Sequence, residues 1–276
     1  CNSMHKSCMS GPAAQLPKRV LEMTPDSGNN IKVRLVQDVG GQERYACLSH
    51  RWGASTHLCQ TTVDSLPSHL HEIPWSLLPK TFQDAAKVAV WLGIKYLWID
   101  SLCIIQDSAE DWKEQAAQMC EIYTGGYVTF AAAWSADSDV GLFRESPSFT
   151  MTPELPLLSR AWVYQERLLS PRIVYFTRYE VAFECARGSR ERICEKHWHQ
   201  IVAEYSGLRI SFTSDRLPAL AGVARQYGTA HSADLGRYVA GMWENCFPSE
   251  LLWYRATQNV HDRPDSYCGP TWSWIS

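Results

Sequence analysis

The chain has 276 residues, of which 45% are hydrophobic and 20% charged, a composition typical of a globular protein with a substantial core. Its formal net charge of −3 at pH 7 argues against nucleic-acid binding, because proteins that bind a phosphate backbone present a broad basic surface. No segment approaches the roughly 18 to 20 apolar residues that cross a bilayer, and no signal segment opens the chain. We therefore expect a cytoplasmic protein that binds neither nucleic acid nor membranes.

Predicted strands and helices alternate through the first half of the chain. Apolar and polar residues alternate in IKVRLV as in a half-buried strand, and a Gly-Gly turn at 40–41 predicts a hairpin with the next strand, YACLS. Ser108 is the predicted N-cap of the longest helix, with Asp111 three residues after it as in a capping box. The predicted elements are strand 31–36, strand 45–49, helix 80–93, strand 96–100, helix 108–126 and strand 127–134. This alternation predicts an α/β fold with a parallel, flavodoxin-like sheet and flanking helices.

The second half of the chain begins with a predicted helix, 159–170, and two strands, 172–176 and 180–185, which we expect to pair. Apolar residues then recur at helical spacing in 198–205 and 217–224. The predicted parts of the chain are an N-terminal segment, 1–30, an α/β domain, 31–185, and a helical C-terminal extension packed on it, 186–276.

Polar side chains follow the apolar strand YACL at the point where it ends. Ser49, His50 and Arg51 come first, and Trp52 is next. Ligands of open parallel sheets bind beyond the carboxyl ends of the strands, so this is a candidate binding site. Arg51 is suited to a phosphate, Trp52 to a ring, and Asp100, which closes the next buried strand, to a ribose hydroxyl. Alternatively, Arg51 and Asp100 form a buried ion pair that joins the two strand ends.

The same strand ends are compatible with a different enzyme class. Cys103 would be a nucleophile, with His50 as its base and Asp100 orienting the imidazole. Cys103 lies between two apolar residues, so a packed thiol is the simpler interpretation.

The ten cysteines are scattered through predicted strands and helices, which favours reduced, mostly buried thiols over a disulfide framework. One group has the spacing of zinc ligands. The candidate ligands are Cys1, His5 and Cys8, with Cys185, Cys194 or His197 as the fourth. Three neighbouring ligands do not complete a site, so no metal is predicted.

Three long blocks resemble the fungal heterokaryon-incompatibility (HET) domain, in the order that this family has them. The blocks are YACLSHRWG (45–53), LWIDSLCIIQDSAEDWKEQAAQMCEIYTGGYVTFAAAW (97–134) and SRAWVYQERLLSPRIVYF (159–176). The tail RPDSYCGPTWSWIS also looks like the family's downstream region. The resemblance implies a role in fungal non-self recognition that ends in cell death, and a core similar to that of TIR domains.

The resemblance to TIR domains also implies site residues. Glu166 lies four residues after Trp162, which is the spacing of the catalytic Glu in NAD-cleaving TIR domains. Glu166 would then be catalytic, while Trp162 and residues 49–52 with Asp100 would bind the substrate. A fixed carboxylate suits this reaction because positive charge develops on the ribose.

Other interpretations of these residues remain open. Gln165, Glu166 and Arg167 would be ordinary helix-surface residues, or Glu166 would pair with Arg160 or Arg51. The enzymatic interpretation has NAD as substrate, and no cofactor is expected. The alternatives are a non-catalytic signalling module that acts by self-association or with protein partners, and a HET fold recruited to act on a small metabolite.

Overall fold

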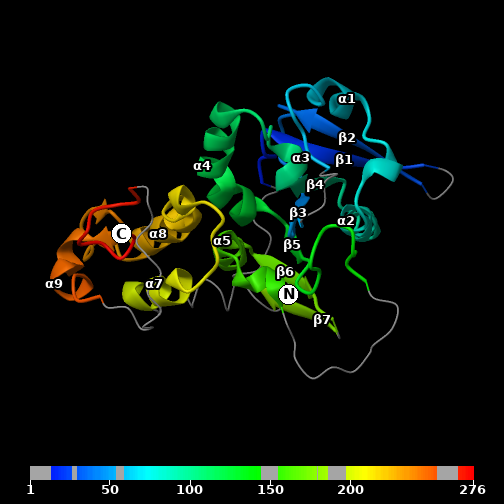
Figure 1. Ribbon diagram of the computed structural model, residues 1–276. Helices are drawn as coiled ribbons and strands as arrows, with labels where there is room; N and C mark the ends of the chain where they lie inside the picture. The colour runs from blue at the N-terminus through cyan, green and yellow to red at the C-terminus, as the bar shows by residue number, and fades with distance from the viewer. Residues whose placement is uncertain are drawn as a thin grey trace.

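A mixed seven-stranded sheet with helices on both faces forms the centre of the molecule, and a mainly helical part lies to one side (Figure 1). The α/β fold class predicted from the sequence is confirmed. The computed structural model describes residues 14–26, 30–53, 59–143, 155–178, 180–185, 197–253 and 267–276. Within these ranges, no helix is both long enough and apolar enough to cross a membrane.

The sheet has a parallel centre and antiparallel edges. Its spatial order is β2-β1-β4-β3-β5-β6-β7. The strands are β1 (Arg19–Pro25), β2 (Ile31–Gln37), β3 (Tyr45–Ser49), β4 (Tyr96–Ile99), β5 (Val128–Ala131), β6 (Arg172–Phe176) and β7 (Val181–Cys185). β4, β3, β5 and β6 run parallel, whereas β1, β2 and β7 run antiparallel to their neighbours. The expected pairing of the strands at 172–176 and 180–185 is confirmed.

The predicted hairpin between residues 31–36 and 45–49 is wrong. β2 pairs with β1, a strand that the sequence analysis did not identify, while β3 lies between β4 and β5. Every residue of β3 is buried, whereas β2 alternates between buried and more exposed residues. A strand that is apolar on both faces is most stable in the centre of a sheet. β3 therefore takes a central place, and β2 takes an edge.

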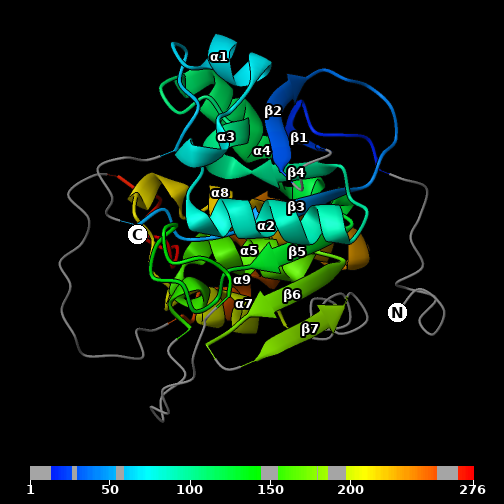
Figure 2. The same ribbon diagram turned by 90° about the vertical axis from the view of Figure 1, so that its right-hand side faces the viewer.

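The four parallel strands follow the flavodoxin-like order. Numbered by their sequence among themselves, they are arranged 2-1-3-4 across the sheet. The helix that links β3 to β4 is α2 (Lys80–Trp91), and it covers one face. The helices that precede β5 and β6 are α4 (Ala109–Gly125) and α5 (Ala161–Leu169), and they cover the other face (Figure 2). Right-handed crossovers require this division, because the chain reverses direction across the sheet after β4.

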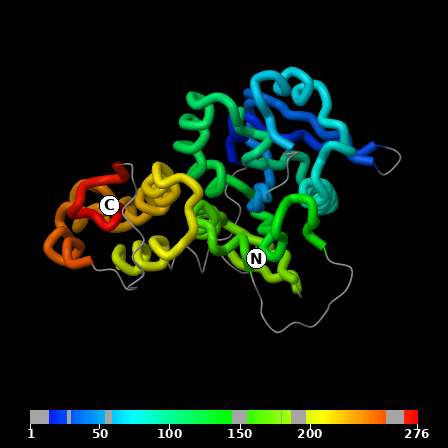
Figure 3. Tube along the Cα trace, in the orientation of Figure 1, coloured from blue at the N-terminus to red at the C-terminus, as the bar shows by residue number. Residues whose placement is uncertain are grey.

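The remaining helices are short or belong to the C-terminal part. They are α1 (Leu66–His71), α3 (Asp100–Cys103), α7 (Trp198–Ser206), α8 (Pro218–Ala230) and α9 (Phe247–Glu250), with 3-10 turns at Trp75–Leu77, Pro156–Ser159, Thr213–Asp215 and Glu244–Cys246. A two-stranded ribbon, β8 (Tyr238–Val239) with β9 (Met242–Trp243), joins this part. α7 and α8 pack against α5, and the chain returns beside them at its end (Figure 3).

Helix α4 begins as the sequence predicts, but Asp111 has a different role from the expected one. The Ser108 side chain accepts a hydrogen bond from Asp111 N at 3.2 Å. The Asp111 carboxylate forms an ion pair with the buried guanidinium of Arg19 and accepts a bond from Ile105 N at 2.9 Å. Arg19 also donates to Cys103 O at 2.8 Å. This polar group joins β1, α3 and α4 at one end of the core.

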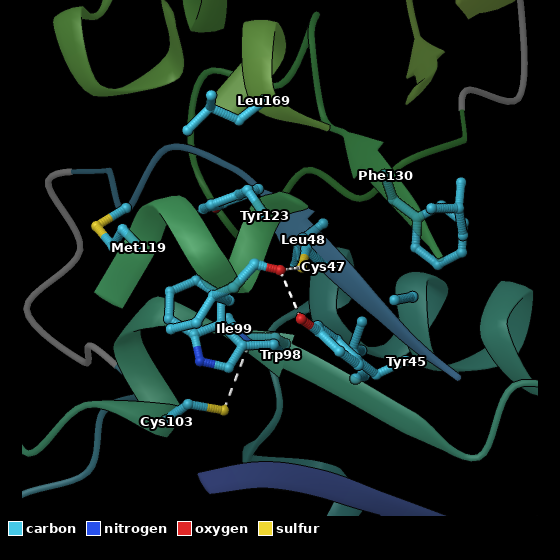
Figure 4. Close-up of a cluster of buried hydrophobic side chains, with 14 of the residues drawn as sticks. Tyr45, Cys47, Leu48, Trp98, Ile99, Cys103, Met119, Tyr123, Phe130 and Leu169 are labelled. Carbon is cyan, nitrogen blue, oxygen red and sulfur yellow. Dashed lines mark hydrogen bonds between the residues drawn. The ribbon is translucent and has the colours of Figure 1, made fainter. Parts of the chain in front are cut away.

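The core between the sheet and α4 is apolar with few polar contacts (Figure 4). Tyr45 Oη donates to Ile122 O at 2.7 Å, which fixes the start of β3 to the end of α4. Trp98 packs edge-on against Tyr123, with ring centroids 5.6 Å apart. Burial of such large side chains stabilises the fold by about 1.5 to 3 kcal/mol each. The core therefore holds the carboxyl ends of β3 and β4 in fixed positions.

Candidate functional site

The candidate site lies where β3 ends, next to β5. In flavodoxin-like sheets this is the position at which the strand order reverses, and ligands bind there. The side chains of β3 alternate between faces. Cys47 contacts Ile122 O of α4, whereas His50 packs edge-on against Phe82 of α2, with ring centroids 4.9 Å apart. Ser49 therefore faces α4 and α5, and His50 faces α2.

Glu166 lies inside the protein on the face of α5 that meets the sheet. Only 7% of this residue is exposed. Burial raises the pKa of its carboxyl to about 7, and the charge of Asp100 acts in the same direction. The hydroxyls of Ser49 and Tyr123 and the charge of Arg160 act the other way. At neutral pH a substantial fraction of the Glu166 carboxyl is therefore protonated.

The alternative in which residues 165–167 lie on the helix surface is wrong for two of them. Gln165 is buried like Glu166, and its Oε1 accepts a hydrogen bond from Gly222 N of α8 at 2.7 Å. Among the described side chains, Glu166 forms no ion pair with Arg160 or Arg51. The Glu166 carboxyl thus has the Ser49 and Tyr123 hydroxyls as polar neighbours and no counter-ion among the described residues.

His50, Asp100 and Trp52 form a second group beside Glu166. His50 Nδ1 lies 3.6 Å from Asp100 Oδ1, and Trp52 Nε1 donates to Asp100 Oδ2 at 3.0 Å. Burial lowers the pKa of His50, Arg160 also lowers it, and Asp100 partly offsets the effect. The imidazole is therefore neutral at physiological pH.

The ion pair that the sequence analysis considered between Arg51 and Asp100 does not form. Within the part of the chain that the structure describes, the Asp100 carboxylate faces His50 and accepts from Trp52 and from Ser101 N. Arg51 is partly exposed, and its carbonyl accepts a hydrogen bond from Ser138 Oγ at 2.9 Å. The ion pair is absent because Trp52, the residue after Arg51, donates a hydrogen bond to the Asp100 carboxylate in its place.

Trp162 is turned toward the C-terminal part. It is partly buried, and its Nε1 donates to Asp215 Oδ2 at 3.2 Å. The structure thus gives Trp162 a contact between α5 and the C-terminal part, and its role in substrate binding stays a prediction.

Two residues of the cluster were not predicted as site residues. Tyr123 of α4 lies against Glu166, and Arg160 Nη1 donates to His50 O at 2.9 Å. Arg160 precedes a helix and Tyr123 sits in an apolar stripe, so nothing in their sequence positions distinguishes them from structural residues.

Several buried polar atoms in this cluster have no hydrogen-bond partner among the described residues. They are Ser49 Oγ, His50 Nδ1, His50 Nε2 and Glu166 Oε2. Buried polar atoms are nearly always satisfied by protein, water or a ligand, and leaving one unsatisfied costs about 1 to 3 kcal/mol. Such atoms gathered at the switch point of the sheet are candidate contacts for a polar ligand.

The structure argues against the cysteine nucleophile. Cys103 Sγ is fully buried and accepts a bond from Ile99 N at 3.5 Å (Figure 4). Burial raises its pKa to about 12, so the sulfur stays a thiol. A thiol of this kind is a poor nucleophile.

The zinc candidates fall mostly where the structure gives no description. Cys1, His5, Cys8 and Cys194 lie outside the described residues. In the ranges that are described, His, Cys, Asp and Glu side chains form no group of three or more that could hold a metal ion.

Comparison with known proteins matches one segment of the chain to a family. Residues 45–150 match the model of the heterokaryon incompatibility protein (HET) family. Neither a curated protein nor a solved structure matches the chain. The matched segment includes Ser49, His50 and Asp100 and ends before α5, which carries Glu166. Over residues 45–150 the chain is therefore similar to the heterokaryon incompatibility (HET) family.

Proposed function

We propose that this protein acts in non-self recognition leading to cell death in a fungal cytoplasm, and that it cleaves NAD between nicotinamide and ribose. The HET match supports a function of the heterokaryon-incompatibility type. The observation that carries the enzymatic part is the buried carboxyl of Glu166, with an unpartnered oxygen, at the carboxyl end of β3. The flavodoxin-like strand order supports a TIR-like core.

The chemistry needs one carboxylate near the reacting carbon. The bond between the ribose C1′ and the nicotinamide nitrogen breaks, and neutral nicotinamide leaves with the electron pair. C1′ gains positive charge, which the ionised form of Glu166 stabilises strongly in a poorly solvated site. Water then adds its oxygen to C1′ and releases one proton, so the products are ADP-ribose, nicotinamide and a proton.

The other residues have positioning roles in this proposal. Ser49 Oγ and the partly exposed Asp100 carboxylate are suited to bind ribose hydroxyls. The neutral imidazole of His50 lies beside Asp100 at the same strand end. Trp52, held by Asp100, offers a ring for stacking.

Nicotinamide release from NAD, measured by chromatography, tests this function. Glu166→Gln keeps the size of the side chain and removes its charge, and we expect it to lose at least 100-fold in rate. Glu121→Gln is the matched control, because it makes the same change at an exposed carboxylate on α4. Equal rates in Glu166→Gln and in wild type would contradict the proposal.

A second candidate function is a signalling module that self-associates without turnover. The observation that favours it is the burial of the cluster: Ser49, His50 and Glu166 are each more than nine-tenths buried. In this case the polar cluster would order the strand ends, and light scattering would show assembly with no nicotinamide release. A fold that acts on another small metabolite would release no nicotinamide either, but it would bind that metabolite at the same residues.

A further inference from the structure

Arg160 occupies the N-terminal boundary of α5, directly before Ala161. It is partly buried, and its Nη1 donates to His50 O. A guanidinium has five N–H donors in a planar fork, and this contact uses one of them. Among the residues that the structure describes, no carboxylate lies within ion-pair distance of Arg160.

The carboxyl groups of Asp100 and Glu166 do not form ion pairs with Arg160. Asp100 contacts Trp52 and His50, and Glu166 lies within the buried cluster. Arg160 influences Glu166 and His50 electrostatically without bonding to the side chain of either. Its charge therefore acts on the cluster, while most of its N–H donors have no acceptor among the residues that the structure describes.

Arg51 adds a second positive charge to the segment that Arg160 contacts. The two residues are linked through His50, whose carbonyl accepts from Arg160 and which directly precedes Arg51. Within the described ranges, Arg51 also forms no ion pair. The positive end of the α5 dipole lies at Arg160 as well. Arg160 contacts the backbone of His50, which lies between Ser49 and Arg51 in the chain. Both arginines therefore lie near the carboxyl end of β3, where the buried Ser49 Oγ has no hydrogen-bond partner among the described residues.

We propose that Arg160, together with Arg51, binds the diphosphate of the substrate and so makes the site specific for nucleotides that carry a diphosphate. This inference rests on the proposed function, because it places the phosphates of the same substrate. The guanidinium fork matches phosphate oxygens in geometry and charge. The ribose then lies on the inner side of the site, near Ser49 and Glu166, where a diphosphate would be repelled by the carboxylates.

Binding of ADP and of adenosine to the purified chain tests the proposal without relying on activity. ADP should bind the wild-type protein about 10- to 100-fold more tightly than adenosine, as expected for charge-assisted contacts. Arg160→Gln keeps an amide donor for His50 O, and it should bind the two compounds equally. Arg237→Gln, which changes an exposed arginine of the C-terminal part, should bind ADP like wild type. Circular dichroism verifies folding, and Arg160→Lys, which keeps the charge without the fork, replaces Arg160→Gln if that variant is unfolded.

Steady-state kinetics with two substrates distinguish failure of this inference from failure of the proposed function. Arg160→Gln should lower kcat/KM for NAD at least tenfold more than kcat/KM for nicotinamide riboside, which has no phosphate and loses only the effect of the Arg160 charge on the Glu166 pKa. If NAD is not cleaved but ADP binding depends on Arg160, the proposed function is wrong and the diphosphate site stands. If ADP binds wild type and Arg160→Gln equally, or does not bind wild type at millimolar concentration, the diphosphate site is wrong.

Discussion

His50 Nδ1 and Asp100 Oδ1 lie 3.6 Å apart where β3 and β4 end side by side. The two residues are 50 positions apart in the sequence, and the parallel pairing of the strands brings them together. Since Asp100 also accepts from Trp52 and from its neighbour Ser101, it joins the segment after β3 to the start of α3.

This arrangement predicts unequal effects of two substitutions. Asp100→Ala removes two hydrogen bonds to a carboxylate and should lower the free energy of unfolding by about 1 to 3 kcal/mol. Arg51→Ala removes a side chain that forms no ion pair with the described residues, and the loss should be under about 0.5 kcal/mol. Urea denaturation measures both. A loss as large for Arg51→Ala as for Asp100→Ala would mean that Arg51 has a structural partner.

Glu166 should make the stability of the protein depend on pH. Its pKa is about 7 in the folded protein, against 4.5 for an unperturbed Glu, so folding favours its protonated form. The stability that this preference gives is fully present below pH 4.5 and is lost as the pH rises through 7. Glu166→Gln stays neutral, so its stability relative to wild type should increase between pH 5 and pH 8, by about 3 kcal/mol at most.

Thermal denaturation at each pH measures this difference. Burial also raises the pKa of Glu250 to about 7, but Glu250 is present in both proteins, and its contribution cancels. A difference between the two proteins that does not change from pH 5 to pH 8 would contradict the burial of an ionisable Glu166.

The pair of Arg19 and Asp111 should contribute more to stability than a surface ion pair. Both side chains are buried, so Asp111→Asn leaves a guanidinium without its counter-ion and should cost about 3 to 5 kcal/mol. Glu114→Gln removes an exposed partner of Lys18 and should cost less than about 1 kcal/mol. Urea denaturation of the two variants tests this, and similar losses would show that solvent reaches Arg19.

Much of the sheet follows from the sequence. Strands 45–49, 96–100 and 127–134 and the helices between them were predicted because each has a clear apolar period, and Gly93 ends α2 as expected. β1 was missed because its pairing with β2 and β4 depends on contacts between distant segments. Local patterns do not encode such partners, which is also why β2 was paired with the wrong strand.

The candidate site was predictable only in part. Ser49 and His50 were predicted because ligands of parallel sheets bind beyond the carboxyl ends of the strands. Glu166 was predicted from the resemblance to TIR domains. The partners of these residues do not follow: Asp100 binds Trp52, and Arg160 binds a backbone carbonyl. Such contacts depend on side-chain directions that are fixed only when α2, α4 and α5 pack on the sheet.

Gly222 should be essential for the packing of α8 on α4 and α5. A Cβ at this position would lie 2.8 Å from Cys120 Cβ and 2.9 Å from Leu169 Cδ1, so Gly222→Ala should cost about 1 to 3 kcal/mol through overpacking. Gly207→Ala is the control, because its Cβ would meet only Glu204 O, at 3.9 Å. Equal melting temperatures for the two variants would show that α8 moves to make room.

The most direct test of the central claim, that Glu166 catalyses cleavage of NAD, is the rate of nicotinamide release as a function of pH. Wild type should release nicotinamide at a rate that rises between pH 6 and pH 8, because the ionised carboxylate is the active form and its pKa is about 7. Glu166→Gln should show no release above background at any pH. No release by wild type at any pH, or equal release by both proteins, would contradict the account.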